Sequence, residues 1–148
     1  MKKTLTLPIA AEAFIPHRLP MRLVDTLISH EGAGGLVEAN PTADSVLVDA
    51  DGVLDGAAFI ELLAQSYAVI KGYDDTLHGR EISEGYLVGV RKMRIVGRAY
   101  AGDRLLVRIS TVGSFEGFAV AEGEILRGDE IIASGTIKLW IVGAGGAA

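Results

Sequence analysis

A single helical segment that is apolar on nearly every side constrains this chain more than any other feature. Residues 55–73 read DGAAFIELLAQSYAVIKGY, a run of good helix formers with hydrophobic side chains in almost all directions. One flat sheet face cannot cover such a helix, so the rest of the chain must wrap around it. Asp55 is the predicted N-cap, and we expect the helix to run to about Ile70 and to stop at Gly72.

Four long β-rich stretches follow the helix and supply the wrapping layer. They read EGYLVGVRKMRIV, DRLLVRISTV, GFAVAEGEILR and EIIASGTIKLWIV, at residues 84–96, 103–112, 117–127 and 130–142. Two more strands are predicted before the helix, at 22–30 and 36–42, separated by a glycine-rich turn and followed by a loop. The pattern predicts an antiparallel sheet of five or six strands around one central helix.

The last stretch alternates as a strand with one buried face does. Ile131, Ala133, Ile137, Leu139 and Ile141 share one face, and Thr136 and Lys138 lie on the other. A long antiparallel sheet curved around one helix is the α+β hotdog fold. We expect one such domain over residues 1–148, with a frayed tail at 143–148. An exposed edge strand favours pairing with another subunit, so we expect a homodimer or a heterodimer.

Composition and charge exclude several classes of function. A net charge of −5 gives no support for nucleic-acid binding, and the absence of cysteine removes disulfides, thiolate nucleophiles and cysteine zinc sites. No uncharged apolar run reaches the roughly 18 residues of a membrane helix, so we expect a cytoplasmic protein. The three histidines lack zinc-site spacing, and the aspartates of DADGVLDGAAFIE lack calcium-loop spacing. We therefore expect neither a metal nor a resident cofactor.

One carboxylate, Glu61, lies on this apolar helix and requires an explanation. Burying an unpaired carboxylate costs several kcal/mol, so it needs a partner, a proton or a role in chemistry. Ala57, Ala64 and Ala68 lie on the same helix surface and leave room for a slender acyl or pantetheine chain. Partial burial would favour the protonated form and general-acid chemistry. The alternative is a structural acid paired with Gln65 one turn on, or with an arginine across an interface.

Three segments, in order, resemble the 3-hydroxyacyl-carrier-protein dehydratases of bacterial fatty-acid synthesis. PHRLPMRLVD (16–25) is similar to that family's P-H-R-Y-P-F-L-L-V-D opening. DGAAFIELLAQ (55–65) and YLVGVRKMRIVGRAYAGDRL (86–105) resemble its helix and its following strand and turn. The resemblance implies active sites at a subunit interface and a thioester substrate on a phosphopantetheine or CoA arm. The implied partner is an acyl carrier protein or a CoA thioester.

The family's functional residues carry over only in part. There, a histidine removes the proton α to the thioester, a helix carboxylate handles the departing hydroxyl, and a glycine N–H binds the thioester oxygen. Glu61 matches the carboxylate, and Gly56 matches the glycine at the helix N-terminus, where the helix dipole favours an oxyanion. The family histidine lies fourteen residues before the carboxylate, a count that lands on Leu47.

No histidine lies within residues 31–77, so His17 is the best remaining base. The alternative for this proline-flanked side chain is a hydrogen bond within its own loop. The basic cluster Arg91, Lys92, Arg94 and Arg98 is either a solvated strand face or a rim that docks an acidic carrier protein.

Three functions therefore remain open. The first is a dehydratase-like enzyme acting on 3-hydroxyacyl thioesters of acyl carrier protein, in fatty-acid, polyketide or polyene-type synthesis. Glu61 is its acid, His17 its base and Gly56 its oxyanion donor, and Ala57, Ala64, Gln65 and Ala68 contact the substrate. The second is an acyl-thioesterase, which the absent histidine suits. The third is a non-catalytic subunit whose carboxylate serves a companion hotdog chain.

Overall fold

The computed structural model describes residues 5–142, so the predicted frayed tail at 143–148 lies outside the described part. The strands are β1 (Ile9–Ala10), β2 (Thr26–Glu31), β3 (Gly34–Ala39), β4 (Glu84–Ile95), β5 (Leu105–Phe115), β6 (Phe118–Arg127) and β7 (Glu130–Val142). A short 3-10 turn, η1 (Ala11–Ala13), follows β1, and one long helix, α1 (Ala57–Leu77), separates β3 from β4.

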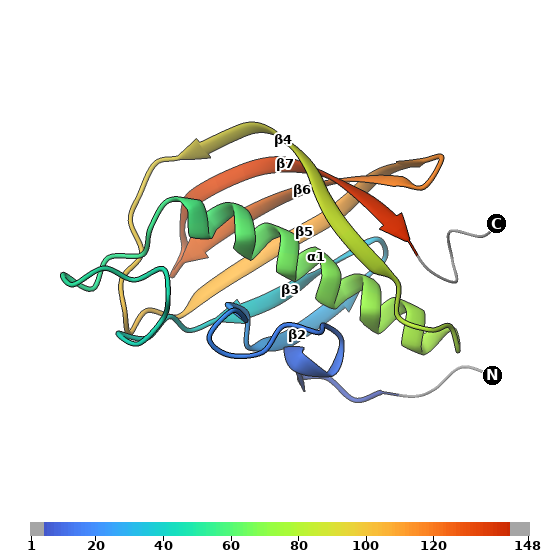
Figure 1. The fold of residues 1–148 in the computed structure, drawn as a ribbon, viewed down its shortest axis with the longest axis horizontal. Helices are drawn as coiled ribbons and strands as arrows, with labels where there is room; N and C mark the ends of the chain where they lie inside the picture. The colour runs from blue at the N-terminus through green and yellow to red at the C-terminus, as the bar shows by residue number, and fades with distance from the viewer. Residues whose placement is uncertain (1–4, 143–148) are drawn as a thin grey trace.

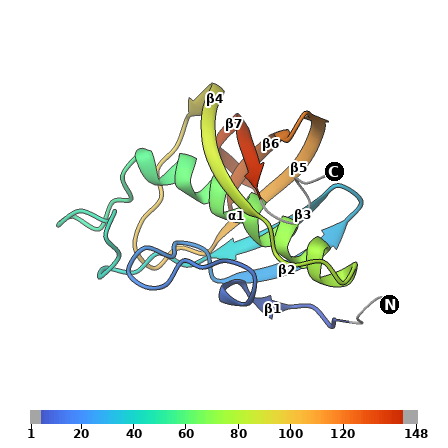
Figure 2. The same ribbon diagram turned by 45° about the vertical axis from the view of Figure 1, so that its right-hand side comes forward.

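The strands form one antiparallel sheet in the order β1-β2-β3-β5-β6-β7-β4. Figure 1 and Figure 2 show α1 lying in the curve of this sheet, with β4 crossing over the helix to reach β7. The predicted antiparallel sheet around one central helix is confirmed. The additional strand relative to the expected five or six is β1, which is only two residues long.

The core lies between α1 and the concave face of the sheet. Its largest fully buried side chains include Phe59, Leu62 and Leu63 of the helix and Ile109, Ile125 and Ile137 of the sheet. Burying each such side chain contributes about 1.5–3 kcal/mol. The two layers approach closely at Gly123, where an added Cβ would lie 2.5 Å from Leu63 Cδ2.

The helix does not stop at Gly72, as the sequence predicted, but continues to Leu77. A Cβ at Gly72 would lie 2.7 Å from the carbonyl oxygen of Phe14, so this glycine lets the segment after η1 pack against the helix. The helix instead ends before Gly79, whose φ of +69° is a left-handed conformation that suits glycine.

The predicted buried face of β7 is wrong at its first position. Ile131 is 43% exposed, whereas its neighbour Ile132 is fully buried. The pairing of β6 with β7 shifts register between Ile125 and Leu126, and such a bulge turns the following residues to the opposite face. Beyond this irregularity the prediction holds: Ala133, Ile137 and Leu139 are buried, and Ile141 packs against the core.

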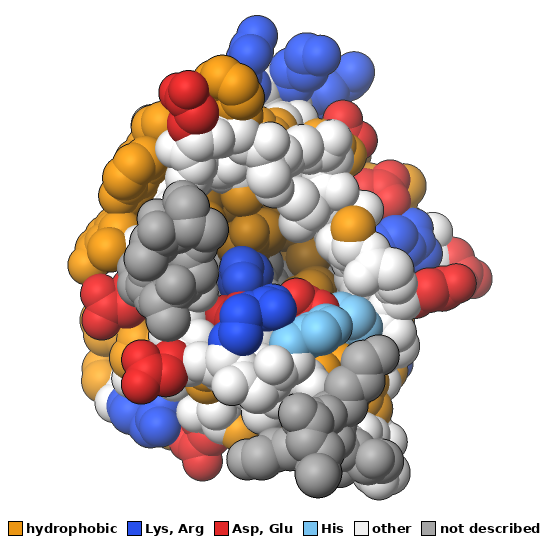
Figure 3. All heavy atoms as spheres, turned by 90° about the vertical axis from the view of Figure 1, so that its right-hand side faces the viewer, with side chains coloured by type: hydrophobic (Ala, Val, Ile, Leu, Met, Phe, Trp, Pro, Cys, Tyr) orange, Lys and Arg blue, Asp and Glu red, His pale blue; other side chains and the backbone are white. Residues whose placement is uncertain are grey.

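The two edges of the sheet differ greatly. The β1 edge is two residues long, whereas the β4 edge is 12 residues long and almost wholly exposed. Its exposed apolar side chains include Tyr86, Val88 and Ile95. Figure 3 shows hydrophobic side chains gathered along one side of the molecule. Within residues 5–142, no helix is long and apolar enough to cross a membrane.

Candidate active site

A pocket beside α1 brings together residues that lie far apart in the sequence. It has a volume of about 180 Å³ and is lined by His17 from the N-terminal loop and by Glu61, Ala64, Gln65 and Ala68 from the helix. Tyr67, Lys71, Ser83, Gly85, Tyr86, Leu87, Leu139 and Ile141 form the remaining walls. Five of the predicted site residues therefore share one pocket, because the N-terminal loop folds back onto the helix surface that carries the carboxylate.

Gln65 holds the N-terminal loop against the helix. Its side chain is 1% exposed, and its Oε1 accepts a hydrogen bond from the Leu23 N–H at 2.8 Å. Its Nε2 donates to the Met21 carbonyl oxygen at 2.9 Å and to Glu61 Oε1 at 2.9 Å. Because Leu23 can only donate and the Met21 carbonyl can only accept, these bonds fix which end of the amide is nitrogen. Sequence reasoning gave Gln65 a substrate contact and missed this role.

The same network orients the Glu61 carboxyl. Oε1 accepts from Gln65, which leaves Oε2 without a partner among the described residues and available to carry the proton of the acid form. The side chain is partly buried, and no ion pair to Glu61 is present among the described residues. The structural alternative proposed a pairing with Gln65, and that bond exists, yet the carboxyl also lines an open pocket.

His17 lies on the loop that Gln65 holds. The ring is partly buried, and its Nδ1 is buried without a hydrogen-bond partner in the described part of the chain. Arg18 braces this loop, because its Nη1 donates to the carbonyl oxygens of Ile15 at 2.8 Å and His17 at 2.9 Å. The sequence analysis offered a structural alternative, in which the His17 ring forms a hydrogen bond within its own loop. In the described chain the loop is bonded through the His17 backbone carbonyl and the Arg18 side chain instead.

The start of the helix lies apart from this pocket. Gly56 and Ala57 are exposed and are not among the residues that line it. Gly56, not the predicted Asp55, stands directly before the first residue of the helix, yet Asp55 Oδ1 still accepts the Ala57 N–H at 2.8 Å. Leu47, where the family histidine would stand, is partly buried against the core. One chain therefore does not bring the predicted oxyanion donor to the carboxylate.

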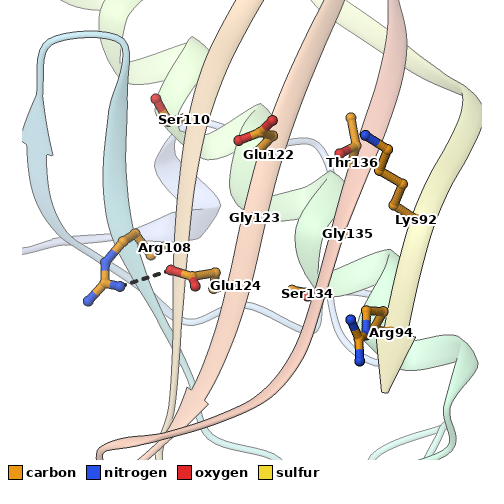
Figure 4. A pocket seen from close by; sticks show the side chains of 10 residues that line it. All are labelled: Lys92, Arg94, Arg108, Ser110, Glu122, Gly123, Glu124, Ser134, Gly135 and Thr136. Atoms are coloured by element: carbon orange, nitrogen blue, oxygen red, sulfur yellow. Dashed lines mark hydrogen bonds and ion pairs between the residues drawn. The ribbon is translucent and has the colours of Figure 1, made fainter. Parts of the chain in front are cut away.

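Two members of the basic cluster, Lys92 and Arg94, lie on the opposite side of the sheet. Figure 4 shows Lys92 and Arg94 reaching from β4 over the outer face of the sheet, with α1 behind it. There they line a hollow of about 430 Å³ together with Thr136 and Ser134 of β7. Arg91, Lys92, Arg94 and Arg98 are all exposed, and within residues 5–142 none of them forms an ion pair.

Every other arginine of the described chain is paired with a carboxylate: Arg18, Arg22, Arg80, Arg104, Arg108 and Arg127. Among the described lysines and arginines outside the cluster, Lys138 alone also lacks an ion pair, and its Nζ lies 4.4 Å from the centroid of the Phe118 ring. The unpaired charge of the cluster is available to an acidic partner.

Asp75 is a buried acid that the sequence analysis did not single out. It is fully buried, accepts from Lys71 Nζ at 2.5 Å and from the Ser83 N–H at 3.0 Å, and pairs with Arg80. Burial alone would raise its pKa, but the hydrogen bonds from Lys71 and Ser83 outweigh this effect and lower it. The i,i+4 spacing of Lys71 and Asp75 was the available signal. The pair fixes Lys71 at the wall of the pocket.

Comparison with known proteins identifies the family. The sequence model of the ApeP-like family, described as ApeP dehydratase, matches residues 9–142. This chain belongs to the ApeP-like dehydratase family. The family-level resemblance carried by the three sequence segments is thereby confirmed.

Individual relatives of this ApeP-like chain agree with that assignment. It is 28% identical to the 3-hydroxyacyl-[acyl-carrier-protein] dehydratase FabZ of Alkaliphilus metalliredigens over 142 residues, covering 90% of this chain and 92% of that protein. The structure of the dehydratase heterocomplex ApeI:P from Xenorhabdus doucetiae matches with a TM-score of 0.84 and 24% identity, over 94% of this chain and 95% of that one.

A hypothetical thioesterase with coenzyme A from Streptococcus pneumoniae matches with a TM-score of 0.63 and 11% identity, over 79% of this chain and 84% of that one. These structural likenesses establish the hotdog fold.

Proposed function

We propose that this chain catalyses the dehydration of a 3-hydroxyacyl thioester to a 2-enoyl thioester and water. His17 removes a proton from carbon 2 of the acyl chain, and that electron pair forms the new double bond as the bond from carbon 3 to oxygen breaks. Glu61 donates its Oε2 proton to the leaving hydroxyl, which departs as water. Exchange with solvent then returns a proton to Glu61 and removes one from His17.

The observation that supports this scheme is the shared pocket of His17 and Glu61. Dehydration needs one base and one acid on the same small substrate, and these two side chains line one cavity floored by Ala64 and Ala68. The His17 ring lines the same pocket as the Glu61 carboxyl, and Gln65 occupies only one of the two Glu61 oxygens.

A carrier protein fits the delivery of this substrate. The FabZ protein of Alkaliphilus metalliredigens, which is 28% identical to this chain, is named for an acyl-carrier-protein substrate. The free charges of Arg91, Lys92 and Arg94 on β4, and of Arg98 just after it, suit docking of an acidic protein. The pantetheine arm would then pass around β4 to the pocket.

The direct test is to incubate the chain with 3-hydroxyacyl carrier protein and to follow the loss of one water by intact mass. The wild type should form the enoyl product, Glu61→Gln should lose at least about 100-fold in rate, and Glu31→Gln, at an exposed strand end, should match the wild type. Full turnover by Glu61→Gln would contradict the assignment. Release of free thiol instead would identify the thioesterase alternative.

A second candidate is a chain that works only with a companion hotdog subunit. The position of the family histidine holds Leu47, Gly56 lies outside the pocket, and β4 presents a long free edge. A companion chain on that edge would supply a histidine to the site that holds Glu61. In return, the Gly56 N–H would act as oxyanion donor at a site shared with that chain. Inactivity alone, with full activity on mixing with a second hotdog chain, would favour this candidate over the first.

A further inference from the structure

The outer face of the sheet carries charges of opposite sign on two different strands. Glu122 and Glu124 of β6 form an acidic column, and Lys92 and Arg94 of β4 form a basic column. β7 runs between these strands, and Figure 4 shows its small side chains at the centre of the hollow of about 430 Å³ that both columns line. The outer face therefore has an acidic side and a basic side, separated by one strand.

The strand registers place the two columns level with each other. Ser134 of β7 pairs with Glu124 on one side and with Arg94 on the other. Two residues further along β7, Thr136 pairs with Glu122 on one side and lies beside the β4 bulge on the other. Within residues 5–142 no ion pair joins the two columns. Each row across the outer face thus offers one acid and one base to a partner.

This arrangement is complementary to itself under one symmetry operation. Consider two copies packed outer face to outer face, with a two-fold axis that runs along β7 between them. The axis exchanges β6 with β4 and keeps each residue at the same height along the strands, so the acidic column of each copy faces the basic column of the other. Packed sheets keep their strands within about 30° of each other, which leaves these short columns in step. An isologous contact of this kind uses every charge pair twice.

The rest of the β7 surface suits such a contact. Trp140 is 39% exposed and packs on Phe118, with the ring centroids 4.7 Å apart. Aromatic side chains are enriched at protein interfaces. Lys138 would face its own copy across the axis, but its Nζ leans over the Phe118 ring at 4.4 Å from the centroid, away from β7. The axis strand therefore presents small and aromatic side chains to its copy, with its lysine turned aside.

We propose that two copies of this chain associate through the outer faces of their sheets, with β7 on the two-fold axis. Glu122 and Glu124 of each copy then pair with Lys92 and Arg94 of the other. This contact differs from pairing along the β4 edge, because it uses the face of the sheet and leaves the backbone groups of that edge open. It is independent of the proposed reaction. A carrier protein that docks on the same two basic side chains would compete with the second copy, so the test uses the purified chain alone.

Charge reversal with rescue tests the pairing of the columns. Glu122→Lys and Lys92→Glu each place like charges opposite one another, so each variant repels its own copy. We expect each variant to weaken self-association at least about tenfold in sedimentation velocity. An equimolar mixture of the two should associate as the wild type does, because the mixed pair restores opposite charges at both contacts. Glu122 is preferred to Glu124, which already pairs with Arg108 at 3.0 Å.

A control variant separates this contact from net charge. Glu31→Lys makes the same change of charge at the exposed end of β2, outside the outer-face hollow. It should associate as the wild type does.

A single introduced thiol tests the position of the axis. The chain has no cysteine, so Thr136→Cys carries one thiol, and an axis along β7 places it beside the thiol of the other copy. A short bis-maleimide should therefore join two Thr136→Cys chains. Ser110→Cys is the matched control on β5, two strands from β7, so its two thiols would lie about 19 Å apart in projection and should stay unlinked.

Equal masses for the wild type and both charge variants at one concentration would overturn the proposal. A mixture of the variants that associates no more than its separate components would also overturn it, as would linking of Ser110→Cys without linking of Thr136→Cys. Circular dichroism shows whether each charge variant is folded. The cross-linking pair decides the question by itself if a charge variant fails to fold.

Discussion

At the scale of single residues, Gln65 links the architecture to the proposed chemistry. One buried amide holds the loop that carries His17 and also orients the Glu61 carboxyl, so a side chain without direct contact with the reaction sets the geometry of both groups. The sequence placed Gln65 one turn from Glu61, but it could not reveal that Met21 and Leu23 return to the same point. That contact depends on the path of a loop.

Replacing Gln65 by leucine should destabilise the fold by about 1–3 kcal/mol, because the Leu23 N–H and the Met21 carbonyl lose their buried partner. Ser66→Ala is the matched control, since it removes an adjacent buried hydroxyl that has no partner and should change stability little. Urea unfolding measures both variants. Equal stabilities for the two variants would contradict the claim that Gln65 holds the N-terminal loop against the helix.

Asp75 should make stability dependent on acid. Its folded-state pKa is lowered, so its contribution is fully present above the unfolded-state value of about 3.9 and is lost as the pH falls through the lower folded-state pKa. The wild type should be more stable than Asp75→Asn at pH 7, and that difference should shrink below about pH 4. Urea unfolding across this range measures it, and a difference independent of pH would refute the assignment.

At the scale of elements, periodicity predicted the existence and order of the strands and helix, but local packing decided where they end. Gly72 reads as a stop signal, yet it lies within α1 because Phe14 approaches it too closely for a side chain. Ile131 fits the alternation of β7, yet the bulge exposes it. Neither close contact nor bulge has a periodic signature, which is why these two predictions failed.

Gly72→Ala separates helix propensity from packing. Alanine is favoured over glycine by about 1 kcal/mol in a helix interior, but its Cβ would lie 2.7 Å from the Phe14 carbonyl oxygen. We expect a net loss of about 1–3 kcal/mol in thermal or urea unfolding. Gly56→Ala is the control, because its Cβ would meet only Ile95 Cδ1 at 3.5 Å. Stabilisation by Gly72→Ala would contradict this prediction, because it would show that the Phe14 segment moves away from the new Cβ at little cost.

We expect the basic cluster to cause most of the salt dependence of carrier-protein binding. Lys92→Asn together with Arg94→Ser removes two free charges, and asparagine tolerates the φ of +54° at position 92. Carrier affinity should fall about tenfold at low salt and much less near 1 M, where charges are screened. Arg104→Ser with Arg127→Ser removes two paired charges and should have a smaller effect. Equal effects would argue against docking at β4.

At the scale of the whole molecule, the sequence predicted the hotdog architecture because a helix that is apolar on nearly every side can be buried in only a few ways. It also predicted that His17, Glu61, Ala64, Gln65 and Ala68 belong to one site, and the fold places them in one pocket. It could not locate the outer-face hollow of the basic cluster, since the direction of side chains around the β4 bulge is set by the register with β7. The hollow lined by Tyr67 and the β5–β6 hairpin likewise arises only when that hairpin meets the helix.

The central claim is that His17 and Glu61 act on one substrate in one pocket, and kcat/KM for enoyl formation by Glu61→Gln, His17→Gln and the double variant tests it most directly. Residues that act as a unit are strongly non-additive, so we expect each single variant to lose about 100-fold and the double variant to lose no more than the worse single one. Multiplication of the two losses, or wild-type activity in either single variant, would contradict the claim.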